Sequence, residues 1–344
     1  MEENTTVIAV DIAKTVFEIA VSDTPGRVNE HHRPKRSGFL AFFKNIQPAT
    51  VVMEACGSAH YWGREIEALG HKVVLLPPHQ VRPYVTRNKT DRTDAKGILE
   101  AFRNDDIHPV PVKTVDQQVL VSMHRFRSGW IGARTAQVNT LRGLLREIGF
   151  FIPEGIKHVV PQVRLLIEDA DSKLPDALRS ILAATCDQIE SLGQLIKKAD
   201  RELESLADQS PAFERISSTP GIGLIAGTAL IGFVGTPHRF PSGRHFASYF
   251  GITPRERSSG GKRHLGRISK RGDAYIRHLF IHGARSVLSH AGRAKSHDRL
   301  RTWALELAKR TTYNKAVVAL ANKIARIAWA VWRNERPYLS VSAA

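Results

Sequence analysis

Cysteine is nearly absent from this 344-residue chain, which has only Cys56 and Cys186. Two cysteines cannot build a disulfide framework or a cysteine-based zinc cluster. Long hydrophobic runs are missing too, because the most apolar stretch, residues 223–234, includes three glycines and is shorter than the ~18 residues of a spanning helix. The first residues, MEENTT, are acidic and polar and lack the pattern of a secretory signal. These absences predict a cytoplasmic protein with no membrane partner.

Acidic residues are scarce in the last quarter of the chain. Overall there are 50 Lys and Arg and 33 Asp and Glu, which gives a net charge of +17 and a pI near 10.2. Residues 251–344 hold 20 Lys and Arg but 5 Asp and Glu, whereas residues 1–110 hold 14 of each kind. Contact with phosphates explains such a local excess better than a solvated basic surface does, so the composition indicates a nucleic-acid partner.

The pattern of hydrophobic residues divides the chain into three parts. Short apolar runs alternate with helical spacing up to residue 110, which predicts an α/β domain with a mixed sheet. Helices are expected over 115–150, 272–290 and 298–333, and a basic loop over 255–271. We therefore expect an α/β domain over 1–110, a helical connector over 111–210 and a mainly helical domain over 211–344.

A heptad pattern lies within the predicted connector. Apolar or small residues recur there at alternating steps of three and four, which is typical of a coiled-coil seam. The seam can pack internally as a helical hairpin or join two subunits, and the pattern leaves both open. Its positions are Leu182, Thr185, Ile189, Leu192, Ile196, Ala199, Leu203 and Leu206.

Four carboxylates follow or begin predicted elements of the first domain. Asp11 and Glu54 each end a short apolar strand, while Asp91 and Asp94 stand three apart at the start of a predicted helix and so face the same way. Carboxylates gathered in one place repel each other, and a hard divalent cation such as Mg²⁺ removes the repulsion. A single Asp after a strand is usually a turn residue, and Asp91 can simply cap its helix. The order of all four together favours a metal site.

Three segments carry a resemblance to a known family: VIAVDIAKTVFEIAV, VVMEACGSAHYW and RNKTDRTDAKGILEAF. They resemble the RuvC-like, RNase H-like DEDD domain of insertion-sequence transposases of the 110 family. The resemblance implies that Asp11, Glu54, Asp91 and Asp94 bind Mg²⁺.

The basic loop is the second distinctive segment. Between Arg255 and Arg271 it has seven basic residues and one acid, together with Ser258, Ser259 and Ser269. Its glycines allow close approach of a ligand to the backbone, so a phosphate-binding loop is the plain interpretation. We expect its basic residues to bind nucleic acid: Arg255, Arg257, Lys262, Arg263, Arg267, Lys270 and Arg271.

The segment FGITPRERSSGGKRHLGRISKRGDAYIRHLF is similar to the C-terminal transposase domain of the same family, closest to its 1111 subgroup. That resemblance implies a nucleophilic serine at Ser259, with Ser258 one alignment step away. It also implies a covalent serine–DNA intermediate, a guide RNA encoded by the element, donor and target double-stranded DNA, a dimer or tetramer, and a nucleoid-associated bacterial enzyme.

Three other functions are compatible with parts of the sequence. A metal nuclease that hydrolyses branched DNA would share every carboxylate and differ only at the serine. A sugar-kinase-like ATPase would need a glycine where Ala13 stands, and it gives the basic tail no role. A non-catalytic nucleic-acid-binding protein would not depend on Asp11.

Overall fold

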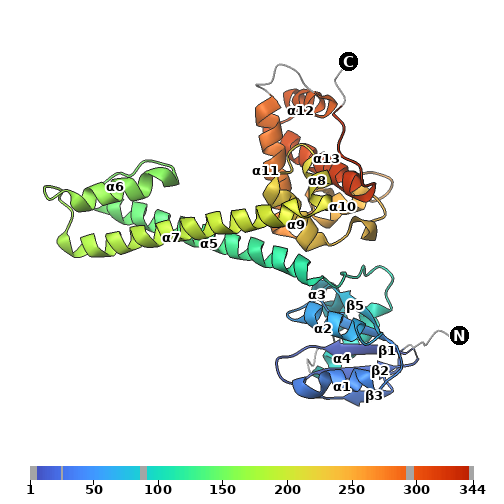
Figure 1. Ribbon diagram of the computed structural model, residues 1–344. Coiled ribbons are helices and arrows are strands. Elements are labelled where there is room, and N and C mark those ends of the chain that lie inside the picture. Colours follow the sequence, from blue (N-terminus) through green and yellow to red (C-terminus); the bar gives the residue numbers. More distant parts are fainter. Residues whose placement is uncertain (1–5, 25, 86–90, 292–297, 341–344) are drawn as a thin grey trace. The chain divides into compact units, whose positions relative to one another are not determined.

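The chain divides into two compact units, Met1–Val115 and Asp116–Ala344 (Figure 1). The computed structural model describes residues 6–24, 26–85, 91–291 and 298–340. The first unit has a mixed sheet with helices, and the second is built mainly of helices. This confirms the fold class expected from the sequence. No helix among the described residues is long and apolar enough to cross a membrane.

A five-stranded sheet organises the first unit, with the strand order β3-β2-β1-β4-β5. β1 pairs antiparallel with β2 and parallel with β4, and β5 extends the parallel part. The near-continuous apolar runs of β1 and β4 are typical of strands covered on both faces. The strands are β1 (Val7–Asp11), β2 (Glu18–Ser22), β3 (Glu30–His32), β4 (Thr50–Glu54) and β5 (Lys72–Leu76).

Each face of this sheet has its own core, because successive side chains of a strand point to opposite faces. Val10 and Met53 pack with Trp62 of α2 on one face. Ala9 and Val52 pack with α4 on the other. The helices of the unit are η1 (Arg36–Gly38), α1 (Phe39–Lys44), α2 (Ala59–Glu67), α3 (Pro78–Val81), η2 (Arg82–Tyr84) and α4 (Asp91–Phe102).

The second unit begins with two long helices that form a hairpin, α5 (Val115–Glu147) and α7 (Asp176–Asp208), with α6 (Ile156–Glu168) between them in sequence (Figure 1). Arg127 Nε of α5 donates to Asp200 Oδ1 of α7 at 2.5 Å. An apolar cluster joins the three helices and includes Leu141, Leu182 and Ile189. The predicted seam therefore packs within the chain, as expected if it forms an internal helical hairpin.

Three positions of the predicted seam, Thr185, Leu192 and Leu206, are only half-buried. Cys186 and Ala207 are buried in place of the first and the last of them. An α-helix has 3.6 residues per turn, so a strict 3.5-residue seam drifts around it. α7 also packs against α6, α8 (Pro211–Ser217) and α9 (Leu224–Val234) in turn, and these neighbours select the buried positions.

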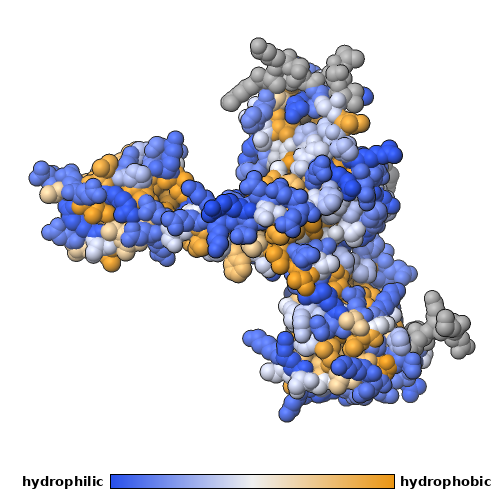
Figure 2. Space-filling model, viewed as in Figure 1, coloured by the Kyte–Doolittle hydropathy of each residue, from blue (hydrophilic) through white to orange (hydrophobic). Residues whose placement is uncertain are grey.

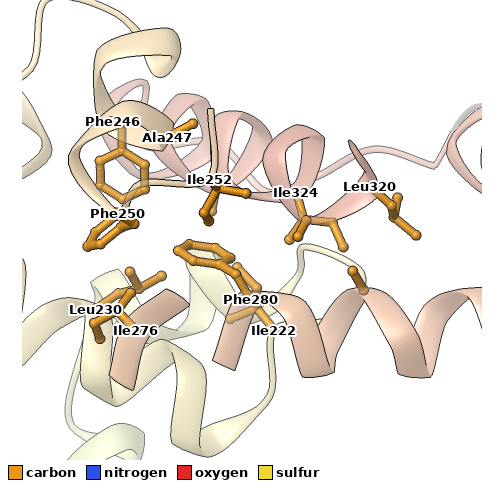
Figure 3. Close-up of a cluster of buried hydrophobic side chains, with 14 of the residues drawn as sticks. Ile222, Leu230, Phe246, Ala247, Phe250, Ile252, Ile276, Phe280, Leu320 and Ile324 are labelled. Carbon is orange, nitrogen blue, oxygen red and sulfur yellow. The ribbon is translucent and has the colours of Figure 1, made fainter. Parts of the chain in front are cut away.

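The remaining helices surround a separate apolar core (Figure 3). Leu230 of α9, Phe246 of α10, Phe280 of α11 and Ile324 of α13 point toward one another there. Burying side chains of this size stabilises the fold by about 1.5–3 kcal/mol each. The elements are α8 (Pro211–Ser217), α9 (Leu224–Val234), η3 (Pro237–Arg239), α10 (Gly243–Tyr249), β6 (Pro254–Glu256), β7 (Leu265–Ile268), α11 (Ala274–Ala291), α12 (Arg299–Arg310) and α13 (Tyr313–Arg333).

Two expectations about this region need correction. The basic segment 255–271 is not a plain loop, because β6 and β7 pair antiparallel within it. The helix expected over 298–333 is interrupted between Arg310 and Tyr313. Thr311 has extended backbone and its hydroxyl donates to the carbonyl of Leu307, which ends α12 and lets α13 fold back against it.

His124 is a buried histidine where α5 meets α9 and α11, with 1% of its surface exposed. Its ring nitrogens lie 3.0 Å from Tyr275 Oη and 3.0 Å from Thr228 Oγ1. Burial, assisted by the positive charge of Arg127 and opposed by Asp200, lowers the pKa of His124 to about 4. This histidine is therefore neutral in the folded chain at neutral pH.

We expect the second unit to lose stability as the pH falls from about 6.5 to about 4. The unfolded chain takes up a proton at His124 near pH 6.5 and the folded chain only near pH 4, so acid favours unfolding across that window. The pKa difference corresponds to about 3 kcal/mol. Chemical denaturation at pH 7 and pH 4.5 measures it. His124→Gln, which cannot titrate, should show a shallower pH dependence, and an equal dependence would contradict the assignment.

Candidate active site

Asp11 and Glu54 lie at one edge of the sheet, as the last residues of β1 and β4. The two strands are parallel neighbours and Val10 pairs with Met53, so the next residue of each strand comes side by side. Both carboxylates are half-buried. Strand alternation puts them on the face where Ala9 and Val52 pack against α4. The structure thus brings together two of the predicted carboxylates.

The pKa of the nearby Cys56 thiol reports the same closeness. Burial raises this pKa first, and the negative charges of Glu54 and Asp11 raise it further. A thiol with a raised pKa is mostly protonated and is a poor nucleophile. The Cys56 thiol therefore lies near both carboxylates.

Asp94 is on α4, the helix that covers this face of the sheet. Its side chain is half-buried, and its Oδ1 atom is buried without a hydrogen-bond partner. A buried carboxylate oxygen with no donor costs free energy, and a cation would remove that cost. Asp91 is the first residue of α4, and its side chain lies outside the described residues.

The three described carboxylates do not form a complete metal-binding cluster by themselves. Among the side chains that the structure describes, no three His, Cys, Asp or Glu are grouped closely enough to hold an ion. Even so, oxygen donors from β1, β4 and α4 on one face, with one of them unpaired, fit a hard divalent cation.

Glu18 is a fourth described carboxylate on this face, and it was not predicted from the sequence. It pairs directly with Asp11 across β1 and β2, and directly opposed residues of antiparallel strands point the same way. Its side chain is 9% exposed and lies 3.6 Å from His31 Nδ1 and 3.8 Å from Arg33 Nε. The sequence feature that could have predicted it is the position of Glu18 at the start of the strand that follows Asp11.

Ser259 is at the tip of the β6–β7 hairpin. Ser259 and Lys262 form the last bridge of the hairpin, and the amide of Lys262 donates to the carbonyl of Ser259 at 3.1 Å. Gly260 and Gly261 between them have φ angles of 56° and 77°. Positive φ at both central positions is the mark of a type I′ turn, which glycine adopts without strain. The Gly-Gly step therefore presents Ser259 at an exposed tip.

The two neighbouring serines differ in their hydrogen bonds. Ser258 Oγ donates to Glu256 Oε1 at 2.8 Å, and Arg263 also binds both oxygens of Glu256 at 3.1 Å. These bonds, Ser258 first, lower the pKa of Glu256. In the described part of the chain the Ser259 hydroxyl makes no hydrogen bond, so it is available to a ligand.

All seven predicted nucleic-acid-binding residues are exposed. Arg255, Arg257, Arg267 and Lys270 line a hollow of about 430 Å³ beside the hairpin, and His264 lines it too. Within the described residues, only Arg263 among the seven has a carboxylate within salt-bridge distance, Glu256 at 3.1 Å. The hairpin and the residues that follow it thus present six cations without carboxylate partners among the described residues.

Comparison with known proteins identifies the family. A model described as "Transposase IS116/IS110/IS902 family" matches residues 213–299, and a DEDD-type model described as "Transposase" matches residues 8–150. The "Probable family 20 transposase" of Pseudomonas aeruginosa is 39% identical over 96% of this chain and 98% of its own length. The chain belongs to the IS116/IS110/IS902 family of transposases. Transposases of the insertion elements IS1111A from Coxiella burnetii and IS1328 from Yersinia enterocolitica are 34% and 35% identical, over 96% and 95% of this chain and 91% and 97% of their own lengths.

The carboxylates and the serine each lie within a matched region of this transposase. The DEDD model spans Asp11, Glu54, Asp91 and Asp94, and the second model spans Ser259 and its hairpin. Membership confirms the resemblance found in the sequence and makes the chain a DNA transposase. The family implies a DNA substrate, and the DEDD domain suggests a requirement for a divalent metal. The carboxylates belong to the first unit and Ser259 to the second.

Proposed function

We propose that this transposase cuts and rejoins the DNA of an insertion sequence, with Asp11, Glu54, Asp91 and Asp94 holding Mg²⁺ and Ser259 attacking the DNA phosphate. The observation that supports it most is the convergence of Asp11 and Glu54 on the face covered by α4, where an oxygen of Asp94 is unpaired. The pair of variants described in the Discussion, one at Ser259 and one at the carboxylates, tests it.

The ligand chemistry favours Mg²⁺ among the divalent cations. The proposed donors are all carboxylate oxygens, which suit a hard cation, and no His or Cys is among them. When bound, the ion would neutralise charge on the phosphate and lower the pKa of an attacking hydroxyl. Asp11 and Glu54 would hold it at the sheet edge, and α4 would cover the site on the same face of the sheet.

The proposed serine step conserves the number of phosphodiester bonds. Ser259 Oγ forms a bond to phosphorus and loses its proton to solvent. The bond from phosphorus to a deoxyribose oxygen breaks, and that oxygen takes up a proton. A serine–DNA phosphodiester replaces the cut one, so the reverse attack by another strand's hydroxyl can rejoin DNA without an outside energy source. The exposed, unbonded hydroxyl of Ser259 supports its role over that of Ser258, which is engaged by Glu256.

The cations of the hairpin would bind the DNA backbone on either side of the cut. We expect Arg267→Ala to weaken DNA binding and to reduce the salt slope of log K by about one unit, because one phosphate contact is lost. Fluorescence anisotropy over a range of salt concentrations measures this. Arg164→Ala is the matched control, because Arg164 is already paired with Asp187 and Glu190. Equal slopes for the two variants would contradict a phosphate contact at Arg267.

We propose that the enzyme assembles as a dimer or tetramer and works with donor DNA, target DNA and an element-encoded guide RNA, in the cytoplasm at the nucleoid. Exposed apolar residues around α6 support an assembly, and Figure 2 shows hydrophobic surface at this end of the hairpin. They include Leu144, Phe151, Leu165 and Ile181, exposed by 58% to 75%. Exposed arginines of α5, such as Arg125 and Arg146, are compatible with RNA. Light scattering with and without guide RNA tests both expectations.

A further inference from the structure

A second hollow lined by cations lies among α12, α13 and the segment after α13. Its volume is about 230 Å³. None of its residues belongs to the β6–β7 hairpin, so it is a separate feature of the second unit. The residues that line it are Arg299, Leu300, Lys323, Ile327, Tyr338 and Leu339.

The positive charges of this hollow are held close together. Lys323 Nζ lies 4.0 Å from the centre of the Trp303 ring, in a cation–π contact. Burial lowers the pKa of Lys323, and the charges of Arg326 and Arg299 lower it further. In the described part of the chain, neither Lys323 nor Arg299, the two cations that line the hollow, has a carboxylate within salt-bridge distance.

The carboxylate next to Arg299 in sequence is already engaged. Asp298 caps α12, where its Oδ1 accepts from the amide of Arg301 at 2.7 Å and its Oδ2 from Arg301 Nη1 at 2.9 Å. It is also buried, at 5% exposure. Within the described residues, Arg299 and Lys323 therefore have no carboxylate paired with them.

We propose that this hollow binds a phosphodiester of a nucleic-acid strand, as a second contact apart from the serine hairpin. Lys323 is half-buried and Arg299 lines the same hollow, so their charges repel one another, and a phosphate would relieve that repulsion. Leu300, Ile327 and the ring of Tyr338 give an apolar wall against which a sugar or base can pack. The inference rests on the proposed function only in that the chain must bind nucleic acid.

The test compares Lys323→Met with Lys309→Met in the full chain. Methionine keeps the aliphatic packing on Trp303 and removes the charge, and Lys309 is a matched lysine of α12 paired with Glu306 at 2.8 Å. Anisotropy with a single-stranded DNA and an RNA of the same sequence gives affinity and salt slope. We expect Lys323→Met to weaken binding about fivefold at 0.1 M salt and to reduce the slope by about 0.7, with Lys309→Met near the parent.

Arg299→Gln should reproduce the effect and serves as the second variant if Lys323→Met unfolds. A drop with DNA alone or with RNA alone identifies the bound strand, and either supports the site. Equal slopes for Lys323→Met and Lys309→Met would overturn it, and so would a Lys323 dependence seen with polyglutamate and not with nucleic acid. The serine–DNA adduct is measured in a separate experiment. If the proposed cleavage chemistry fails, the effect of Lys323→Met on nucleic-acid affinity can still be interpreted.

Discussion

Replacing Ser259 with alanine is expected to abolish the covalent protein–DNA product and to lower strand exchange by about three orders of magnitude or more, because the attacking oxygen is removed. DNA binding should stay near the parent value, since the cations of the hairpin remain. Gly260 and Gly261 set the turn, and alanine is compatible with the bridge position of residue 259. Denaturing gels of end-labelled DNA measure the adduct, and mass spectrometry of the cross-linked peptide places it.

Ser258→Ala is the matched control, one residue away on the same hairpin. It removes a hydroxyl that is bound to Glu256, and Arg263 still holds that carboxylate, so we expect most activity to remain. A label on Ser258 would move the nucleophile by one residue. If Ser259→Ala still cleaves DNA and yields as much joined product, the chain acts as a hydrolytic metal nuclease of RuvC type and the recombinase mechanism is wrong.

The sheet edge could be predicted from sequence because its signals are local. Apolar strands that stop at Asp11 and Glu54 and a helix from Asp91 to Phe102 follow directly from hydrophobic spacing. β3, Glu30–His32, was missed because a short polar edge strand has no alternation to detect. Its backbone pairs with β2 all the same, and it brings His31 close to Glu18.

The hairpin could not be predicted, because nothing apolar alternates along it. All residues of β6 and three of the four in β7 are exposed, so the strands gain little from burial. The ends of the hairpin are fixed by contacts between distant residues instead. Gly272 has a φ of 75°, and a Cβ there would lie 1.8 Å from the carbonyl of Tyr249. Arg277 Nη1 also donates to the carbonyls of Phe250 and Arg271, which ties the base of the hairpin to α11.

Residues 220–223 form a turn between α8 and α9. A contact with a distant part of the chain explains why this turn contains glycine. Gly221 has a φ of 85°, and a Cβ on it would lie 2.9 Å from the carbonyl of Gly283 in α11. A Cβ on Gly283 would in turn lie 2.0 Å from the carbonyl of Gly221. The two glycines are therefore required by close backbone packing, which sequence spacing alone does not reveal.

Asp11→Asn and Glu54→Gln are each expected to lower DNA cleavage by about three orders of magnitude or more and to weaken binding of Mg²⁺ or Mn²⁺. Each variant removes one negative charge from neighbouring positions of the sheet edge, where the proposed ion is held by charge and by oxygen donors. The amide is close in size to the carboxylate, so the sheet should fold normally. Isothermal titration with the metal alone measures the affinity independently of cleavage.

The carboxylate variants and the hairpin variants should not change DNA affinity in the same direction. Removing a carboxylate takes away repulsion toward phosphate, so affinity for DNA should be unchanged or slightly higher while cleavage is lost. Glu67→Gln is the matched control, because Glu67 is on α2, the helix that packs on the opposite face of the sheet. If Asp11→Asn keeps full transposition, the chain acts as a nucleic-acid-binding protein without catalysis at this edge. If Glu67→Gln loses cleavage to the same degree, the loss reflects general destabilisation of the domain and not a metal held beside α4.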